Sequence, residues 1–139
     1  MKYKYVEDLT SDVMFEAYGK DLKELFSNSA EALFEIVCKI GEIVPSKEIT
    51  IHASAPSEKE LLHEWLSQLL TESDTEGIFF NKFEVEKIEG NGPYSLTGKA
   101  WGEEASVEKG ETLVKAVTYY GLKLEKTKEG YLARVSLDI

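Results

Sequence analysis

The chain has 139 residues, of which 42% are hydrophobic, and this length and composition are typical of one folded domain. It shows neither an apolar run long enough to cross a bilayer nor a basic, apolar leader, so neither a membrane protein nor a secreted protein is expected. The formal net charge of −10 argues against a chain that grips a phosphate backbone by itself, because nucleic-acid affinity depends mainly on cations. If RNA is involved, we expect a partner protein to hold it.

The N-terminal part is predicted to contain two short strands and a helix. The strands cover Tyr3–Val6 and Val13–Tyr18, with the acidic turn Glu7–Asp12 between them. Asp21, with Glu24 three residues later, resembles a capping box and marks the start of the helix. Apolar residues then recur at steps of three and four, which predicts one buried face.

This helix is expected to end before Gly41 and Pro45. Its apolar face includes Cys38, which is the only cysteine of the chain, so no internal disulfide can form. A lone thiol on an apolar face is expected to pack in the core. Together with the missing leader and the missing membrane span, this composition points to a cytoplasmic protein.

The rest of the chain is predicted to hold a second helix and several strands. A strand at Glu48–Ala53 precedes a helix that begins at a capping box of Ser57 and Glu60. Strands follow at 79–88, 94–101 and 114–125 and at the end of the chain, separated by turns and a loop rich in glycine and charge. Because hairpins force antiparallel pairing, we expect an α+β fold with two helices packed on a mostly antiparallel β-sheet, and residues 1–139 as a single domain.

Groups of residues typical of an enzyme are scarce. The chain has no glycine-rich phosphate loop, and its serines and threonines have no convincing general base nearby in sequence. His52 and His63 show no metal-ligand spacing with another histidine or cysteine, so each is expected at the surface or in satisfied packing. No catalytic or cofactor-binding residue is therefore predicted, and we expect a protein that is not an enzyme.

The last ten residues read as a strand. Alternate positions carry the less polar side chains, namely Tyr131, Ala133, Val135, Leu137 and Ile139. We expect Ile139 to be packed and its terminal carboxylate to be fixed, with Asp138 pointing to the opposite face. Hard divalent cations prefer several oxygen ligands. Asp12, Asp138 and the Ile139 carboxylate would supply them if the first and last strands lie side by side, with Asp8 behind them, although a solvated strand end is the plainer alternative.

Several segments, in order along the chain, resemble the archease family. They are Asp8–Asp12, Ala17–Phe26, Leu61–Leu66, Asp74–Gly77, Val114–Tyr119 and Val135–Ile139. Each segment is short, but their order and spacing extend across essentially the whole chain. The set is therefore a specific resemblance.

The resemblance implies an accessory protein. Archeases assist the tRNA-splicing RNA ligase, which joins RNA halves bearing a 3′ phosphate or cyclic phosphate to a 5′ hydroxyl. They promote guanylylation of the ligase's active-site histidine and its multiple turnover. The family carries an acidic site for calcium or another divalent cation, and by motif its ligands carry over to Asp12, Asp138 and the C-terminal Ile139.

The chain also departs from the family pattern. Family members often have histidine where this chain has Leu9 and Tyr120, and near the position of Gly110. The departures remove the imidazoles and leave the carboxylates, so we expect a mechanism centred on carboxylates. Two alternatives stay open: an adaptor or chaperone for RNA-modifying enzymes with a structural metal, and, less favoured, a small metal-dependent hydrolase.

Overall fold

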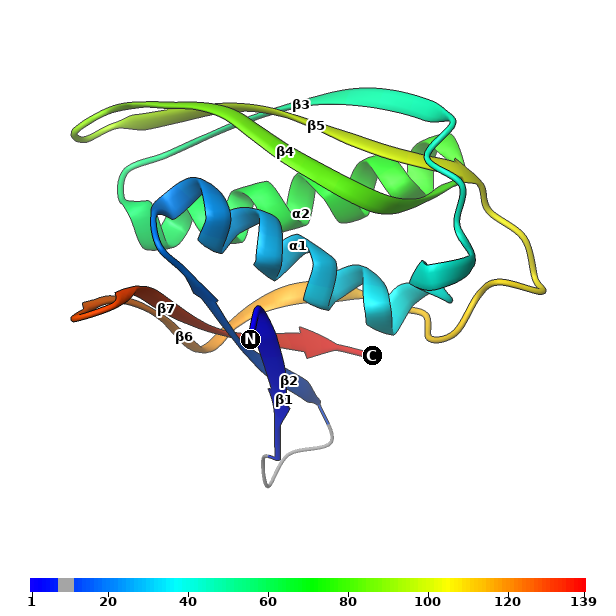
Figure 1. Ribbon diagram of the computed structural model, residues 1–139, viewed down its shortest axis with the longest axis horizontal. Helices are drawn as coiled ribbons and strands as arrows, with labels where there is room; N and C mark the ends of the chain where they lie inside the picture. Colours follow the sequence, from blue (N-terminus) through cyan, green and yellow to red (C-terminus); the bar gives the residue numbers. More distant parts are fainter. Residues whose placement is uncertain (8–11) are drawn as a thin grey trace.

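The structure is a computed structural model that describes residues 1–7 and 12–139 (Figure 1). Its helices and strands follow the chain in a simple order. They are β1 (Tyr3–Val6), β2 (Val13–Gly19), α1 (Leu22–Val37), the short 3-10 helix η1 (Ile40–Glu42), β3 (Lys47–Ala55), α2 (Glu58–Glu76), β4 (Ile78–Gly90), β5 (Tyr94–Glu104), β6 (Ala116–Thr127) and β7 (Gly130–Asp138).

The strands form two sheets. One sheet has the order β1-β2-β7-β6 and the other has the order β3-β5-β4, and the pairings between these strands are antiparallel. The predicted α+β class, with two helices and antiparallel strands, is confirmed. The structure refines it, because the strands that were expected in one sheet are divided between two.

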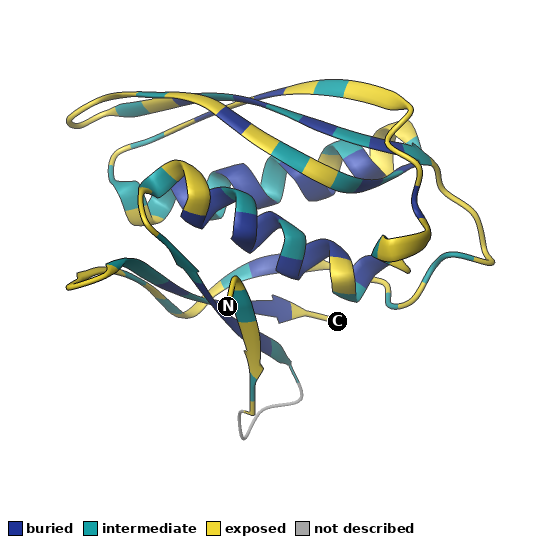
Figure 2. Cartoon of the chain, viewed as in Figure 1, coloured by how far each residue is buried: buried dark blue, intermediate teal, exposed yellow. Residues whose placement is uncertain are grey.

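The two helices lie in a layer between the two sheets (Figure 1). Helix α1 contacts β4 of one sheet and β2 of the other, and α2 contacts β3 and β6 in the same way. A helix covered on two sides needs apolar or small residues around most of its circumference. Figure 2 shows this burial along both helices, while the exposed positions concentrate on loops and strands.

Trp65 of α2 is the largest fully buried side chain. Its indole Nε1 donates a hydrogen bond of 3.0 Å to the carbonyl oxygen of Phe26 in α1, so the buried polar atom is satisfied. Its ring lies against Gly98 of β5, where an added Cβ would be only 2.9 Å from the indole. Trp65 therefore joins both helices to the three-stranded sheet.

Both predicted helix starts are confirmed by capping hydrogen bonds. The Asp21 carboxylate accepts from the Glu24 backbone N–H at 2.9 Å, and the Ser57 hydroxyl accepts from the Glu60 N–H at 3.2 Å. Each bond satisfies a donor that the first turn of a helix leaves without a partner. The local sequence alone is sufficient to place the N-terminal ends of both helices.

The predicted end of α1 is too late. The helix ends at Val37, and Cys38 already has an extended backbone that forms an isolated antiparallel bridge with Gly110. The next residue, Lys39, donates its backbone N–H to the carbonyl oxygen of Lys109 at 2.8 Å. A loop distant in the sequence therefore captures the chain here before the local helix signal ends.

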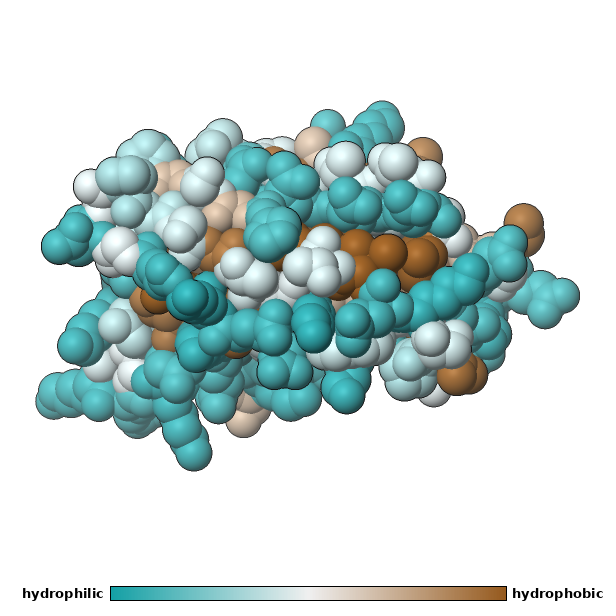
Figure 3. All heavy atoms as spheres, turned by 90° about the horizontal axis from the view of Figure 1, so that it is seen from above, coloured by the Kyte–Doolittle hydropathy of each residue, from teal (hydrophilic) through white to brown (hydrophobic). Residues whose placement is uncertain are grey.

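The face of the molecule seen from above is largely polar. Figure 3, which views the molecule from above, shows mainly hydrophilic residues with a narrow hydrophobic band along the middle. Within residues 1–7 and 12–139, no helix has both the length and the apolar character needed to span a membrane.

Candidate metal centre

Two of the three predicted metal ligands lie at the same end of one strand pair. In the antiparallel pairing of β2 with β7, Val13 is the partner of Leu137. Asp12 directly precedes Val13 and Asp138 directly follows Leu137, so the two aspartates are brought together at this end of the sheet. Adjacent strands are about 4.8 Å apart, which places the two backbones close enough for both carboxylates to approach one cation.

The neighbour of the last strand is β2 and not β1. Strand β7 lies between β2 and β6, and β1 forms the edge beyond β2. The turn before β2 therefore carries Asp12 to the end of β7, although the first strand of the chain does not touch the last. We use the name acidic corner for Asp12, Asp138 and Ile139.

Ile139 is not packed as predicted. The strand ends at Asp138, and Ile139 follows it with 39% of its surface exposed, whereas Leu137 is fully buried. The alternation of the strand reaches Leu137, and the strand pairings among residues 1–7 and 12–139 extend as far as Asp138. Its carboxylate is still only one residue beyond a strand that is bonded on both sides.

The corner is exposed to solvent on the Asp138 side and half-buried at Asp12. The backbone N–H of Lys115 donates a hydrogen bond of 2.7 Å to the Asp138 carbonyl oxygen, which fixes the end of β7 against the segment that leads into β6. Two neighbouring carboxylates repel each other unless positive charge lies between them. A cation bound between them would reduce this repulsion.

A cluster of side chains alone does not make up the site. Among residues 1–7 and 12–139, no three His, Cys, Asp or Glu side chains gather closely enough to hold a metal ion. The predicted set instead combines two aspartates with a main-chain carboxylate. Asp8, expected behind these ligands, and Leu9, one of the expected departures from the family pattern, lie outside the described residues.

The described positions that replace family histidines have different surroundings. Gly110 belongs to the loop bridge with Cys38, and Tyr120 is 55% exposed on β6. The carbonyl oxygen of Tyr120 accepts a hydrogen bond of 2.9 Å from the Ser136 hydroxyl. Gly110 has no side chain to contribute to the acidic corner, and the Tyr120 contact described here is made by its main chain.

His63 and Cys38 lie in packed surroundings, whereas His52 is at the surface. His63 Nε2 lies 2.8 Å from the Val117 carbonyl oxygen, so this nitrogen carries the proton, and its ring stacks on Tyr119 at 3.9 Å between centroids. His52 is exposed on β3, with Thr97 as its neighbour at 3.4 Å. Cys38 is buried, and burial raises the pKa of its thiol to about 12, which makes it a poor nucleophile at neutral pH.

Fold and corner together define a small, acidic α+β protein that gathers carboxylates from distant parts of its chain at one end of a four-stranded sheet. The model of the Archease protein family (MTH1598/TM1083) matches residues 3–139 of this chain. The chain is 42% identical to protein archease of Methanosarcina acetivorans over 141 residues, covering 99% of this chain and 96% of that protein. It is 36% identical to protein archease of Archaeoglobus fulgidus, with full coverage of both chains.

Solved structures agree with this relationship. The solution structure of Methanobacterium thermoautotrophicum protein 1598 has a TM-score of 0.84 and 34% identity, and the match covers 99% of this chain and 98% of that one. The crystal structure of a Thermotoga maritima archease, described as a possible chaperone, shares the fold with a TM-score of 0.61 at 19% identity, over 98% of this chain and 97% of that one. The chain belongs to the archease family.

Proposed function

We propose that this chain is an accessory activator of the tRNA-splicing RNA ligase. It would promote guanylylation of the ligase and its multiple turnover through a divalent cation, calcium or another, bound at the acidic corner. The family membership supports this role. The observation that carries it is the convergence of Asp12 and Asp138 at one end of the β2–β7 pair, since these are the residues to which the family's acidic motif carries over.

The acidic corner suits a hard cation. Its donors are all oxygen atoms, which calcium and magnesium prefer, and its exposed side leaves room for water or for a group from a partner. Asp12, Asp138 and the Ile139 carboxylate would hold the ion. When bound, such an ion neutralises negative charge and orients phosphate oxygens.

The chain's own contribution would be to favour one conformation of the ligase. An activator shifts an equilibrium only by binding one state more tightly than another. The corner ends a strand hydrogen-bonded to both neighbours, so its carboxylates would be presented in a fixed arrangement. Tight binding to the conformer that is ready for guanylylation would then raise the rate of that step.

The packing of the reactive side chains supports an accessory role. His63 Nε2 is hydrogen-bonded to the Val117 carbonyl oxygen and its ring stacks on Tyr119, although its buried Nδ1 has no hydrogen-bond partner among the described residues; Cys38 is buried in the core, and its pKa is raised. Glu16, the charged side chain that is buried, is neutralised by Arg134. These groups are therefore engaged in the fold, which argues against the alternative of a metal-dependent hydrolase.

The description of the Thermotoga maritima relative as a possible chaperone favours a second candidate. In that case the chain would act as an adaptor or chaperone for RNA-modifying enzymes, and the cation would have a structural role. An adaptor of this kind would prevent loss of the partner on heating without changing the guanylylation rate of folded ligase. We propose a cytoplasmic location for either role, with RNA contacted only through the partner.

The test uses the RNA ligase of the same organism with GTP and a divalent cation. The wild-type chain should raise the rate of ligase guanylylation, and alone it should neither join nor cleave RNA. Asp12→Ala and Asp138→Ala should lose most of the stimulation while remaining folded, because both residues lie at strand ends where truncation is mild for stability. Asp74→Ala, at an exposed position of α2, is the matched control and should stimulate normally. Full stimulation by both corner variants would reject this mechanism.

A further inference from the structure

Two aliphatic side chains are exposed on the loop that joins β5 to β6. Val107 is 98% exposed and Leu113 is 75% exposed. They lie at the rim of a pocket of about 200 Å³, which Val37 of α1 and Phe79 of β4 also line. A pocket of this size accepts roughly one apolar side chain. We use the name 105–115 loop for this segment, which projects at the right in Figure 1.

Backbone hydrogen bonds fix the 105–115 loop to the rest of the fold. The Ala105 N–H donates to the Gly77 carbonyl oxygen at 2.8 Å, and the Glu111 N–H donates to the Val37 carbonyl oxygen at 3.0 Å. The Thr112 N–H donates to the carbonyl oxygen of Ile36 at 3.1 Å. Because both ends of the loop are held in this way, it cannot simply rotate its aliphatic side chains into the core.

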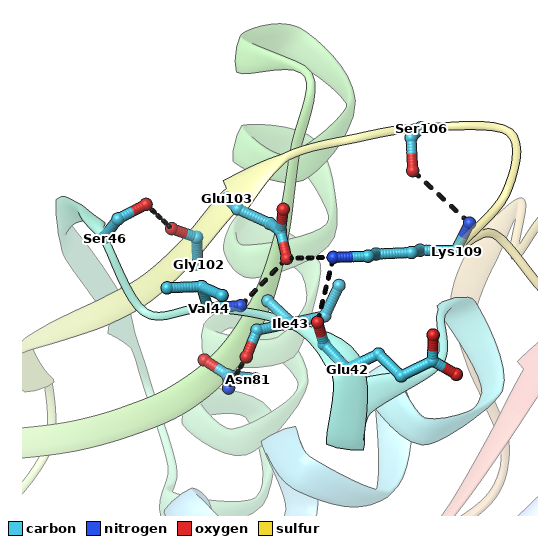
Figure 4. Close-up of polar contacts among 9 residues, drawn as sticks. All are labelled: Glu42, Ile43, Val44, Ser46, Asn81, Gly102, Glu103, Ser106 and Lys109. Carbon is cyan, nitrogen blue, oxygen red and sulfur yellow. Dashed lines mark hydrogen bonds and ion pairs between the residues drawn. The ribbon is translucent and has the colours of Figure 1, made fainter.

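A polar network at Lys109 adds to this rigidity (Figure 4). Its ammonium group lies 2.8 Å from Glu103 Oε1 and donates to the Glu42 carbonyl oxygen at 3.0 Å. The same Glu103 oxygen accepts the Val44 backbone N–H at 2.9 Å, and the Ser106 hydroxyl accepts the Lys109 N–H at 3.3 Å. Lys109 therefore ties the loop to β5 and to the end of η1.

The chemistry around the pocket indicates what it would bind. Glu104, Glu108 and Glu111 are exposed on or beside the loop, and the whole chain carries a net charge of −10. Apolar side chains at the centre of an interface with charged residues at its rim are typical of protein–protein contacts. Glu111 is the charged residue in the pocket lining, and the chain as a whole is strongly acidic, so this surface is complementary to an apolar side chain flanked by lysine or arginine.

The 105–115 loop is continuous with the acidic corner. Its last residue, Lys115, donates its backbone N–H to the Asp138 carbonyl oxygen at 2.7 Å. Leu113, which lines the pocket, is only two residues before Lys115 in the chain, so the pocket lies near the end of β7. One contact surface would include the pocket as well as the carboxylates.

We propose that the 105–115 loop is a docking surface for the RNA ligase, and that its pocket receives an apolar side chain from a basic segment of that enzyme. This inference rests on the proposed function and adds a separation of roles to it. The loop would supply affinity, whereas Asp12 and Asp138 would supply the stimulation. The two sets of residues should then affect different measured quantities.

The test is a binding titration of the full chain against the purified ligase, combined with guanylylation rates. Val107→Ser and Leu113→Ser should raise the dissociation constant at least tenfold, and saturating amounts of either variant should restore the full stimulated rate. Val44→Ser, at a valine that is 56% exposed and outside the pocket, is the matched control and should bind within twofold of wild type. Unchanged melting temperatures would show that the variants are folded.

Each outcome has a distinct meaning. Binding by the Val107 and Leu113 variants within twofold of wild type would overturn the docking surface and leave the activator function intact. Wild-type chain that neither binds nor stimulates the ligase would overturn the proposed function and this inference with it. If wild type self-associates in sedimentation and Val107→Ser abolishes that association, the occupant is a second copy and the proposal is wrong.

Discussion

Arg134 of β7 and Glu16 of β2 are direct cross-strand partners, and the arginine donates two hydrogen bonds to a single carboxylate oxygen of the glutamate. The Nε and Nη2 distances to Glu16 Oε2 are 3.1 and 2.5 Å. The Tyr18 hydroxyl donates to the other oxygen at 3.1 Å. Hydrogen bonding from Arg134 is the main reason that the pKa of Glu16 lies below its ordinary value.

This pair predicts a specific pH dependence of stability. Because the pKa of Glu16 is lower in the folded chain than in the unfolded chain, its contribution is present above its ordinary pKa of 4.5 and is lost as the pH falls through the folded value. Glu16→Gln should lower the free energy of unfolding by about 1–2 kcal/mol at pH 7. In acid, the difference in the free energy of unfolding between Glu16→Gln and wild type should shrink, because Glu16 of the wild type becomes protonated. Urea denaturation at a series of pH values measures this, and a difference that stays constant down to pH ~2 would contradict the assignment to Glu16.

The proposed cation site predicts a loss of calcium affinity on removal of one carboxylate. Asp12→Asn keeps the size of the side chain and removes its charge, and it should weaken calcium binding at least tenfold, or about 1.4 kcal/mol. Asp74→Asn on the exposed face of α2 should leave the affinity unchanged. Calorimetric titration of the three proteins is the measurement. Equal affinities would exclude Asp12 as a ligand.

The terminal carboxylate is tested by extension of the chain. A short flexible tail after Ile139 converts the carboxylate into a neutral amide and crowds the acidic corner, but it should hardly affect the fold. Calcium affinity and ligase stimulation should therefore fall together. A tail of the same length before Met1 should have little effect on either. If both tailed proteins behave alike in the two assays, Ile139 is simply a solvated strand end.

Gly98 predicts a packing defect. An alanine there would place its Cβ 2.9 Å from both the Trp65 ring and the Glu84 carbonyl oxygen. Contacts this short are essentially never seen for Cβ atoms in proteins. Gly98→Ala should lower the free energy of unfolding by about 2 kcal/mol because backbone and indole must both shift. Gly41→Ala is the control, since nothing lies within 4 Å of an added Cβ at that position. Chemical denaturation that shows equal stability for the two variants would contradict the close packing of Trp65 on β5.

The sequence predicted the elements whose signals are local. The capping boxes at Asp21 and Ser57 are confirmed because each needs only a few neighbouring residues to form. The end of α1 was missed because it depends on a contact between Cys38 and Gly110, which are distant in the sequence. The division into two sheets was missed for a similar reason. An amphipathic pattern shows which residues are buried but not which strands cover them.

For the candidate site, too, the sequence missed features that depend on contacts distant in the sequence. Placing Asp12 near Asp138 required the last strand to lie beside the start of the chain; the β2–β7 register brings the two positions to one end of a strand pair, and their role as metal ligands stays a prediction. The expected packing of Ile139 was wrong, because period-2 alternation predicts a face but cannot show that the partner strand has already ended. The exposed pair Val107 and Leu113 had no detectable signal, since an apolar residue in a loop becomes informative only when its exposure is known.

The order of the strands has a consequence for how the protein is made. The sheet β3-β5-β4 is built from residues 47–104, a continuous middle stretch, whereas the other sheet takes β1 and β2 from residues 3–19 and β6 and β7 from residues 116–138. The Glu16–Arg134 pair spans 118 positions. During synthesis on the ribosome, β2 must therefore wait for β7, and the backbone N–H and C=O groups on that edge of β2 lack their strand partners until β7 arrives. The acidic corner can form only after that pairing, so a nascent or truncated chain would lack it. Cation binding at the corner would then report that β7 had paired with β2.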